Sequence, residues 1–176
     1  MKKLLIVLVL IAALALALAG CGETVTPEKV EPGDPGEENE TPAAEKYAVG
    51  DTVKMGDLQF TLNGVRYEKG SEFWEPDEGT KWLVFDCILE NKGSESEVIS
   101  SLMMFKLYDA DSYSKEIAMA DNLKGSLDGE LGAGRKMAGE VAFTVDEDES
   151  AWEFVFEPQV FGFGQAIYDI SASDIK

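Results

Sequence analysis

The chain has 176 residues, with 15 lysines and arginines against 34 aspartates and glutamates, no histidine and two cysteines, and its formal net charge is −19. The absence of histidine excludes Ser-His-Asp and Cys-His nucleophiles and histidine-ligated zinc. An acidic chain also lacks the positive surface that binds phosphate backbones, so we expect no nucleic-acid partner.

The N-terminal segment has the pattern of a secretion signal. Two lysines precede an apolar run from Leu4 to Ala19, which is near the lower length limit for a membrane-spanning helix of about 17–25 residues. The run leads into Leu18-Ala19-Gly20-Cys21, which resembles the bacterial lipobox, where small residues precede a cysteine that receives diacylglycerol. This resemblance predicts a lipoprotein signal peptide over residues 1–20 and lipidation of Cys21. An uncleaved membrane anchor with an incidental cysteine is the alternative.

Removal of this signal peptide would leave 13 basic and 34 acidic residues, a formal charge of −21. No basic patch could then assist membrane binding, so the acyl chains must hold the protein. At about 0.8 kcal/mol per buried CH₂, two or three chains are sufficient. We therefore expect a lipid-anchored protein on the extracytoplasmic side of the cell membrane, with the membrane as its first partner.

Residues 21–46 have the composition of an extended linker that starts at the acylated cysteine. The stretch from Gly22 to Lys46 holds four of the six prolines, eight acidic residues and no aromatic residue. Such a segment cannot bury enough apolar surface to fold, which predicts disorder. Its span would be on the order of 25–30 Å as a flexible coil and up to roughly 78 Å as polyproline II.

Residues 47–176 are long enough for one domain with its own core. Apolar residues there recur mainly at every second position, the period of a β-strand, and residues typical of turns separate the runs. The runs begin near Leu58, Lys81, Met103, Met137, Trp152 and Ala166. This pattern predicts an all-β fold, an immunoglobulin-like β-sandwich of seven or eight antiparallel strands, with a β-barrel as the structural alternative.

Two details of the strand pattern make sharper predictions. In the first run the apolar positions change parity at Asn63-Gly64, which predicts a β-bulge. In the second run the charged Asp86 and Glu90 mark the even positions as the wetter face. The odd positions should then point inward: Leu83, Phe85, Cys87 and Leu89. This position would make Cys87 a buried and inert thiol.

Several motifs together resemble a known bacterial family. Besides the lipobox and acidic linker, the sequence contains Val49-Gly50-Asp51, Glu90-Asn91-Lys92-Gly93, a run from Leu131 to Lys136, and Gly139-Glu140-Val141-Ala142-Phe143. These resemble the telokin-like, immunoglobulin-fold domain of uncharacterised bacterial lipoproteins, which is similar to mycobacterial secreted immunogenic proteins. The resemblance covers roughly Tyr47 to Glu157 and implies an extracellular fold with no established activity.

The sequence departs from that family at two places. Ala133 stands where members usually have proline before the glycine of a turn, and the loop Glu68–Thr80 has no counterpart.

This loop contains Phe73 and Trp74 among acidic residues. Because loops at the ends of sandwiches often carry recognition, the two aromatic residues are candidates for a recognition surface. Packing against the end of the sandwich is the alternative, and Phe161 and Phe163 pose the same question.

A second candidate is a run of four acidic residues, Asp146, Glu147, Asp148 and Glu149. Adjacent carboxylates repel one another and a hard cation would relieve that repulsion, so we consider a weak calcium site, with a solvated acidic turn as the alternative. Asp109-Ala110-Asp111 begins like a helix-loop-helix calcium loop, but Ser114 and Ala120 stand where that motif needs glycine and glutamate. Apart from the diacylglycerol on Cys21, we expect no cofactor.

Taken together, the residues favour a non-enzymatic, membrane-anchored lipoprotein that displays a β-sandwich binding or interaction module. Its expected partner is a component of the cell envelope or another protein. A passive surface protein without a dedicated ligand is one alternative. A carboxylate-based glycan-cleaving enzyme is the less favoured one, because no pair of acidic residues lies in a recognisable motif.

Overall fold

The computed structural model of the chain describes residues 28–29, 46–158 and 164–176. The predicted signal peptide, Cys21, most of the predicted linker, Phe161 and Phe163 lie outside the described residues. In the part of the chain that is described, no helix is long and apolar enough to cross a membrane.

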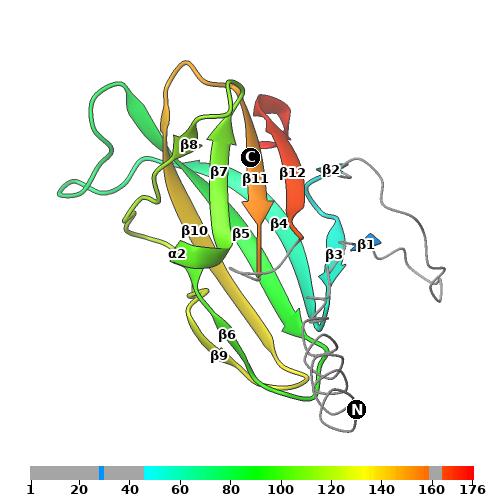
Figure 1. Cartoon of the computed structure of the whole chain (residues 1–176). Coiled ribbons are helices and arrows are strands. Elements are labelled where there is room, and N and C mark those ends of the chain that lie inside the picture. The colour runs from blue at the N-terminus through cyan, green and yellow to red at the C-terminus, as the bar shows by residue number, and fades with distance from the viewer. Residues whose placement is uncertain (1–27, 30–45, 159–163) are drawn as a thin grey trace, which may run out of the picture.

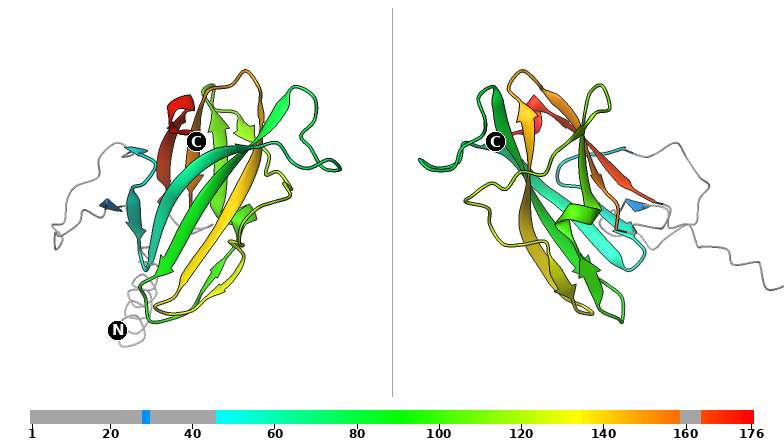
Figure 2. Two further views of the ribbon diagram at one scale, coloured as in Figure 1. Left: turned by 180° about the vertical axis from the view of Figure 1, so that it is seen from behind. Right: turned by 60° about the vertical axis from the view of Figure 1, so that its left-hand side comes forward.

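The fold consists of two sheets packed face to face (Figures 1 and 2). One sheet contains, in spatial order, β1 (Glu28–Lys29), β3 (Thr52–Met55), β4 (Leu58–Glu68), β5 (Thr80–Asn91) and β10 (Lys136–Asp146). The other contains β2 (Lys46–Tyr47), β12 (Ala166–Ser171), β11 (Ala151–Phe156), β7 (Phe105–Asp109) and β8 (Ser114–Lys115).

All strand pairs in these two sheets are antiparallel except β2 with β12. A small third sheet joins β6 (Glu97–Ile99) to β9 (Gly129–Leu131); in Figure 1 it lies below α2 (Ser101–Met104) and beside the lower halves of β5 and β10. A 3-10 turn, η2 (Ala172–Asp174), follows β12. The predicted all-β sandwich is confirmed, and its two separate layers exclude the barrel alternative.

Aromatic side chains from both sheets fill the space between the layers. The ring of Phe85 on β5 stacks on Phe154 of β11 with centroids 4.2 Å apart, and Phe60 on β4 stacks on Phe156 at 4.4 Å. The predicted inward positions are confirmed, because all four predicted residues of β5 are fully buried: Leu83, Phe85, Cys87 and Leu89. The predicted bulge is also present, since the β4–β5 register shifts between Leu62 and Gly64.

The prediction that the even positions of β5 face water is wrong for its first half. Trp82 and Val84 are buried on the outer face of the sheet, where they form a second cluster with Ala118 and Ala142. Residues 116–124 cover this face because they pair beside β10: Ala118 N donates to the Ala142 carbonyl at 2.8 Å. We name residues 116–124 the covering segment.

The run that begins at Met103 also differs from its prediction. Met103 belongs to the short helix α2 and is exposed, and the strand β7 begins only at Phe105. Met104, the last residue of α2, is buried and accepts a backbone hydrogen bond from Glu157 at 2.8 Å. This contact fixes the helix against the end of β11, so the strand pattern is interrupted where the chain crosses between the third sheet and the sandwich.

Within the predicted linker, Glu28 and Lys29 form β1 on the outer edge of the first sheet. They pair with Lys54 and Val53 of β3, and the Lys29 ammonium lies 3.3 Å from an Asp51 carboxylate oxygen. The reason is that β3 is otherwise an edge strand, whose unpaired N–H and C=O groups accept any extended segment nearby. These two residues are therefore ordered in the fold and do not follow the prediction of disorder.

Candidate functional site

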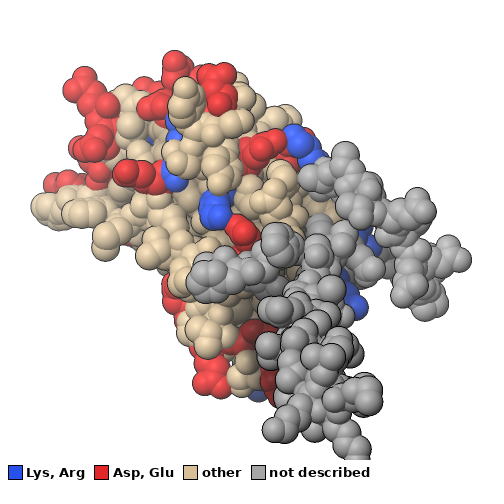
Figure 3. Space-filling model, viewed as in Figure 1, with Lys and Arg blue, Asp and Glu red and all other residues tan. Residues whose placement is uncertain are grey.

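Among the described residues, the most exposed aromatic side chain, that of Phe73, lies on the loop between β4 and β5 together with Trp74. Phe73 is 89% exposed and Trp74 is 53% exposed, and Met119 of the covering segment is 82% exposed. The loop projects at the upper left of Figure 1, and in the space-filling view that end of the molecule shows uncharged atoms with acidic groups above them (Figure 3). We name Phe73, Trp74 and Met119 the aromatic tip.

Backbone hydrogen bonds give this loop a defined shape. Ser71 N donates to the Trp74 carbonyl at 2.8 Å, and Trp74 N donates to the Ser71 carbonyl at 3.2 Å, which closes a tight turn. Gly70 enters the turn with φ +77°, and a Cβ there would lie 2.1 Å from the Trp74 carbonyl oxygen. Only glycine fits both the backbone angle and this close approach.

The tryptophan side chain links the loop to the covering segment. Its indole Nε1 donates a hydrogen bond to the Met119 carbonyl at 2.5 Å. This bond uses the polar edge of the ring, so the exposed part of Trp74 is apolar. The loop and the covering segment are therefore joined at Trp74 and Met119, and both segments contribute exposed apolar side chains.

A charged network at the base of this surface holds both segments. Arg66 on β4 donates to the buried Glu140 of β10 at 3.0 Å and to Glu68 at 2.6 Å. The second oxygen of Glu68 accepts the backbone N–H groups of Lys69 and Gly70, where the loop begins. Glu140 also accepts the backbone N–H of Lys124 at 2.8 Å, at the end of the covering segment.

The hydrogen bonds of this network keep its side chains in their charged forms. The hydrogen bond from Arg66 lowers the pKa of Glu68, with help from the backbone N–H groups of the loop. Burial by itself raises the pKa of Glu140, but the hydrogen bonds from Arg66 and from Lys124 N outweigh it, so the pKa of Glu140 is lowered. The pKa of Arg66 is raised, chiefly by Glu140. All three side chains are charged at neutral pH.

The carboxylates around the aromatic tip differ from those of the network. Four exposed acidic residues lie within seven positions of the loop: Glu72, Glu75, Asp77 and Glu78. Among the described residues, no lysine or arginine forms an ion pair with any of them. The loop therefore presents apolar surface next to negative charge that the domain itself leaves uncompensated.

The acidic turn between β10 and β11 has a different arrangement. Lys115 of β8 forms ion pairs with Asp146 and Asp109, each at 3.2 Å, and with Glu149. Burial opposes the charge of Lys115, but hydrogen bonds to these three carboxylates raise its pKa above the usual range. The ammonium thus occupies the position where a cation would relieve the repulsion between the carboxylates.

The other two residues of this turn do not join that cluster. The side chains of Glu147 and Asp148 are exposed, and the Glu147 carbonyl accepts a hydrogen bond from Lys81 at 2.9 Å. Across the described part of the chain, no group of three or more acidic or cysteine residues is placed to hold a metal ion. Weak calcium binding by this turn stays a prediction.

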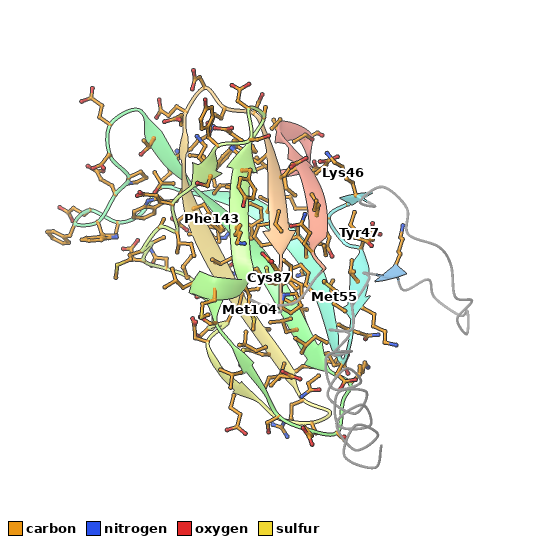
Figure 4. The ribbon with its side chains drawn as sticks, in the orientation of Figure 1. Lys46, Tyr47, Met55, Cys87, Met104 and Phe143 are labelled. Carbon is orange, nitrogen blue, oxygen red and sulfur yellow. The ribbon has the colours of Figure 1, made fainter. Side chains whose placement is uncertain are left out.

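Cys87 lies in the interior of the sandwich, as predicted (Figure 4). Burial raises the pKa of its thiol well above the usual range, and the charges of Asp86 and Glu140 add to this effect. A thiol that stays protonated and is closed off from solvent is a poor nucleophile and a poor metal ligand. Cys87 therefore acts as a small core residue.

Sequence reasoning found Phe73 and Trp74 but missed Met119 and the network below them. Nothing in the pattern around Met119 distinguishes it, because its place depends on pairing of the covering segment with β10. The sequence contains only a weak signal of the Arg66–Glu140 ion pair, because each residue is a charged position within a run of alternating apolar residues. Using that signal would have required knowing that both strands flank β5.

The two packed sheets and the exposed loop at one end define a β-sandwich domain that presents a shaped apolar surface. Residues 47–167 match a domain of unknown function, DUF4352, and the chain belongs to this family. No curated protein matches the chain.

Several solved structures share the fold at low sequence identity. A candidate lipoprotein of Bacillus subtilis, ycdA, is 18% identical with a TM-score of 0.54, and the match covers 76% of this chain but only 40% of that one. An uncharacterised β-sandwich protein of Clostridium difficile is 12% identical, with a TM-score of 0.50 and coverages of 75% and 99%.

A secreted protein of Mycobacterium tuberculosis, MPT63, is also 12% identical with a TM-score of 0.50, and its match covers 72% of this chain and 98% of that protein. At the level of the fold, this likeness agrees with the predicted resemblance to mycobacterial secreted proteins.

Proposed function

We propose that this protein is a non-enzymatic lipoprotein, anchored through Cys21 on the extracytoplasmic side of the membrane, whose β-sandwich binds a cell-envelope component through the aromatic tip. The N-terminal sequence pattern supports the location. So do the descriptions of two proteins of similar fold, one as a candidate lipoprotein and one as secreted. The telokin-like, immunoglobulin-fold assignment within the family is part of the same proposal.

The exposure of Phe73 and Trp74 on a shaped loop carries the binding role. Burying an aromatic side chain contributes about 1.5–3 kcal/mol, and the described residues provide no such burial for Phe73. The alternative of packing against the sandwich accounts only for the half of Trp74 that is covered. Because the turn, the indole hydrogen bond and the charged network hold the loop in place, a partner would meet a preorganised surface.

The alternative of a glycan-cleaving enzyme receives no support from two clusters in which carboxylates converge. Asp109, Asp146 and Glu149 surround Lys115, and Glu68 and Glu140 surround Arg66. A glycosidase needs one carboxyl group with a raised pKa to act as a general acid. Here a cation lies between the carboxylates, and the pKa values of Asp109, Glu68 and Glu140 are lowered.

The anchor is tested by cell fractionation. Replacing Cys21 by serine removes the thiol to which diacylglycerol would be attached, so the Cys21→Ser protein should leave the membrane fraction. If this variant stays in the membrane pellet after an alkaline wash, a spanning N-terminal helix holds the protein instead.

The binding role is tested with the soluble chain 21–176 carrying Cys21→Ser, titrated against isolated cell-envelope fractions. We expect saturable binding that Phe73→Ala with Trp74→Ala weakens by more than about tenfold. The matched control is Leu102→Ala with Met103→Ala, a neighbouring pair on α2 that is 75% and 51% exposed. Absence of saturable binding would favour the passive surface protein, and equal losses in both variants would place the interaction elsewhere.

A further inference from the structure

We propose that the aromatic tip binds a basic polypeptide, a segment in which lysine or arginine side chains flank an apolar side chain. This inference rests on the proposed binding role of the same surface and specifies the chemistry of its partner. The apolar residue would cover Phe73 and Met119, and the cations would meet the four loop carboxylates.

Charge complementarity is the first argument. Some acidic side chains elsewhere in the described domain are matched by the domain's own cations: Lys46 pairs with Glu153 and Asp169, and Lys106 pairs with Glu157. The four loop carboxylates have no such partner, although all of them are exposed. A partner that brings cations therefore supplies the interaction that the fold leaves open at this loop.

The second argument comes from how this domain holds its own lysines. The ammonium of Lys81 lies 4.4 Å from the ring centroid of Tyr67 and 5.9 Å from that of Trp152. Aromatic faces attract cations, and carboxylates near the ring add to that attraction. Phe73 and Trp74 offer aromatic surface beside exposed carboxylates, where an external cation can reach both.

The position of the loop and its charge argue against a lipid surface as the partner. Bacterial membranes present anionic lipids, which the loop carboxylates would repel. The loop also lies on the opposite side of the domain from β1, where the chain from Cys21 joins the sandwich (Figures 1 and 2). A basic polypeptide satisfies both the apolar surface and the negative charge.

The test uses the soluble chain 21–176 with Cys21→Ser and a short peptide with lysines on both sides of a single leucine. Trp74 is the exposed one of three tryptophans, since Trp82 and Trp152 are buried, so tryptophan fluorescence reports binding at the tip. We expect saturable binding that weakens as sodium chloride is added. A peptide with glutamates in place of the lysines should not bind.

Two charge-matched variants establish the location. Glu72→Gln with Glu75→Gln should weaken peptide binding by more than about tenfold. Glu95→Gln with Glu130→Gln makes the same change in net charge near the third sheet, on exposed residues, and should change it by less than about twofold. Equal losses in the two variants would mean non-specific attraction to an acidic protein and would overturn the inference.

The remaining outcomes separate this inference from the proposed function. If envelope binding requires Phe73 and Trp74 but the lysine peptide does not bind, the partner is not basic and only the inference fails. If neither envelope nor peptide binds, both fail. If vesicles of anionic lipid change the fluorescence of Trp74 more than the peptide does, the surface meets lipid and the inference is overturned.

Discussion

Replacing Arg66 by alanine should destabilise the domain more than loss of an ordinary surface charge. The change leaves Glu140, whose side chain is only 4% exposed, with a buried charge and only one remaining hydrogen-bond donor, Lys124 N. Removing one partner of a buried ion pair costs about 3–5 kcal/mol, and because the Arg66 side chain is itself 27% exposed we expect about 2–3 kcal/mol. For a domain of this size, that corresponds to a melting temperature lower by roughly 6–12 °C.

The pH dependence gives this prediction its sharpest form. The pKa values of Glu68 and Glu140 are lowered in the folded protein, so their contribution is present above the unfolded pKa of about 4.3 and is lost as the pH falls through the folded values. Without Arg66, burial raises the pKa of Glu140. Acidification then protonates Glu140, which removes the unpaired buried charge that destabilises the variant. The difference in unfolding free energy between wild type and Arg66→Ala should therefore shrink below about pH 4.5.

Urea unfolding followed at neutral and acidic pH measures this difference directly. Arg66→Met combined with Glu140→Gln is the control, because it removes both charges, keeps an acceptor for Lys124 N and should cost less than Arg66→Ala alone. A loss of stability in Arg66→Ala that is the same at pH 7 and pH 4 would refute the ion-pair reasoning and would point to lost packing of the arginine stem.

Three further predictions concern residues away from that network. Cys87→Ser should cost about 1–3 kcal/mol by burying a hydroxyl, and the native thiol should react with a thiol reagent only when the domain unfolds. Gly70→Ala should destabilise the folded conformation of the turn by about 1–3 kcal/mol. Faster proteolysis of the loop and a changed Trp74 fluorescence would report this effect, whereas an unchanged proteolysis rate and fluorescence would contradict the proposed turn. Millimolar calcium should raise the melting temperature of Lys115→Gln more than that of wild type, because the variant leaves three carboxylates without their lysine partner. Thermal melting curves that coincide in calcium, magnesium and sodium chloride of matched ionic strength, for both proteins, would exclude a calcium site.

The sandwich itself could be predicted because strand alternation is a local property of the sequence. Leu83, Phe85 and Leu89 stand an even number of positions apart, so their side chains point to the same face of the strand. The bulge at Gly64 was equally local, since a change of parity is visible without knowledge of any partner strand.

The errors and omissions arose where long-range pairing decides the outcome. Burial of Trp82 and Val84 on the outer face depends on the covering segment, which is more than thirty residues away along the chain. The same holds for Lys115, because the sequence shows an acidic turn but not the strand β8 that brings a lysine into it. Of the candidate site, the aromatic residues were predicted from the sequence, while the hydrogen bonds and charges that give the loop its shape were not.

The pairing of β1 with β3 determines how force would be transmitted through an anchored protein. Six residues separate Cys21 from Glu28, and their contour allows about 25 Å at most. If Cys21 is lipidated as proposed, this pairing holds the β3 edge within that distance of the bilayer and directs the aromatic tip outward. Tension on a partner bound at the tip would pass through the sandwich to β1, which is held by a pairing of only two residues. This short pairing should separate before the longer strand pairs of the sandwich, so the anchor would lengthen while the domain stays folded.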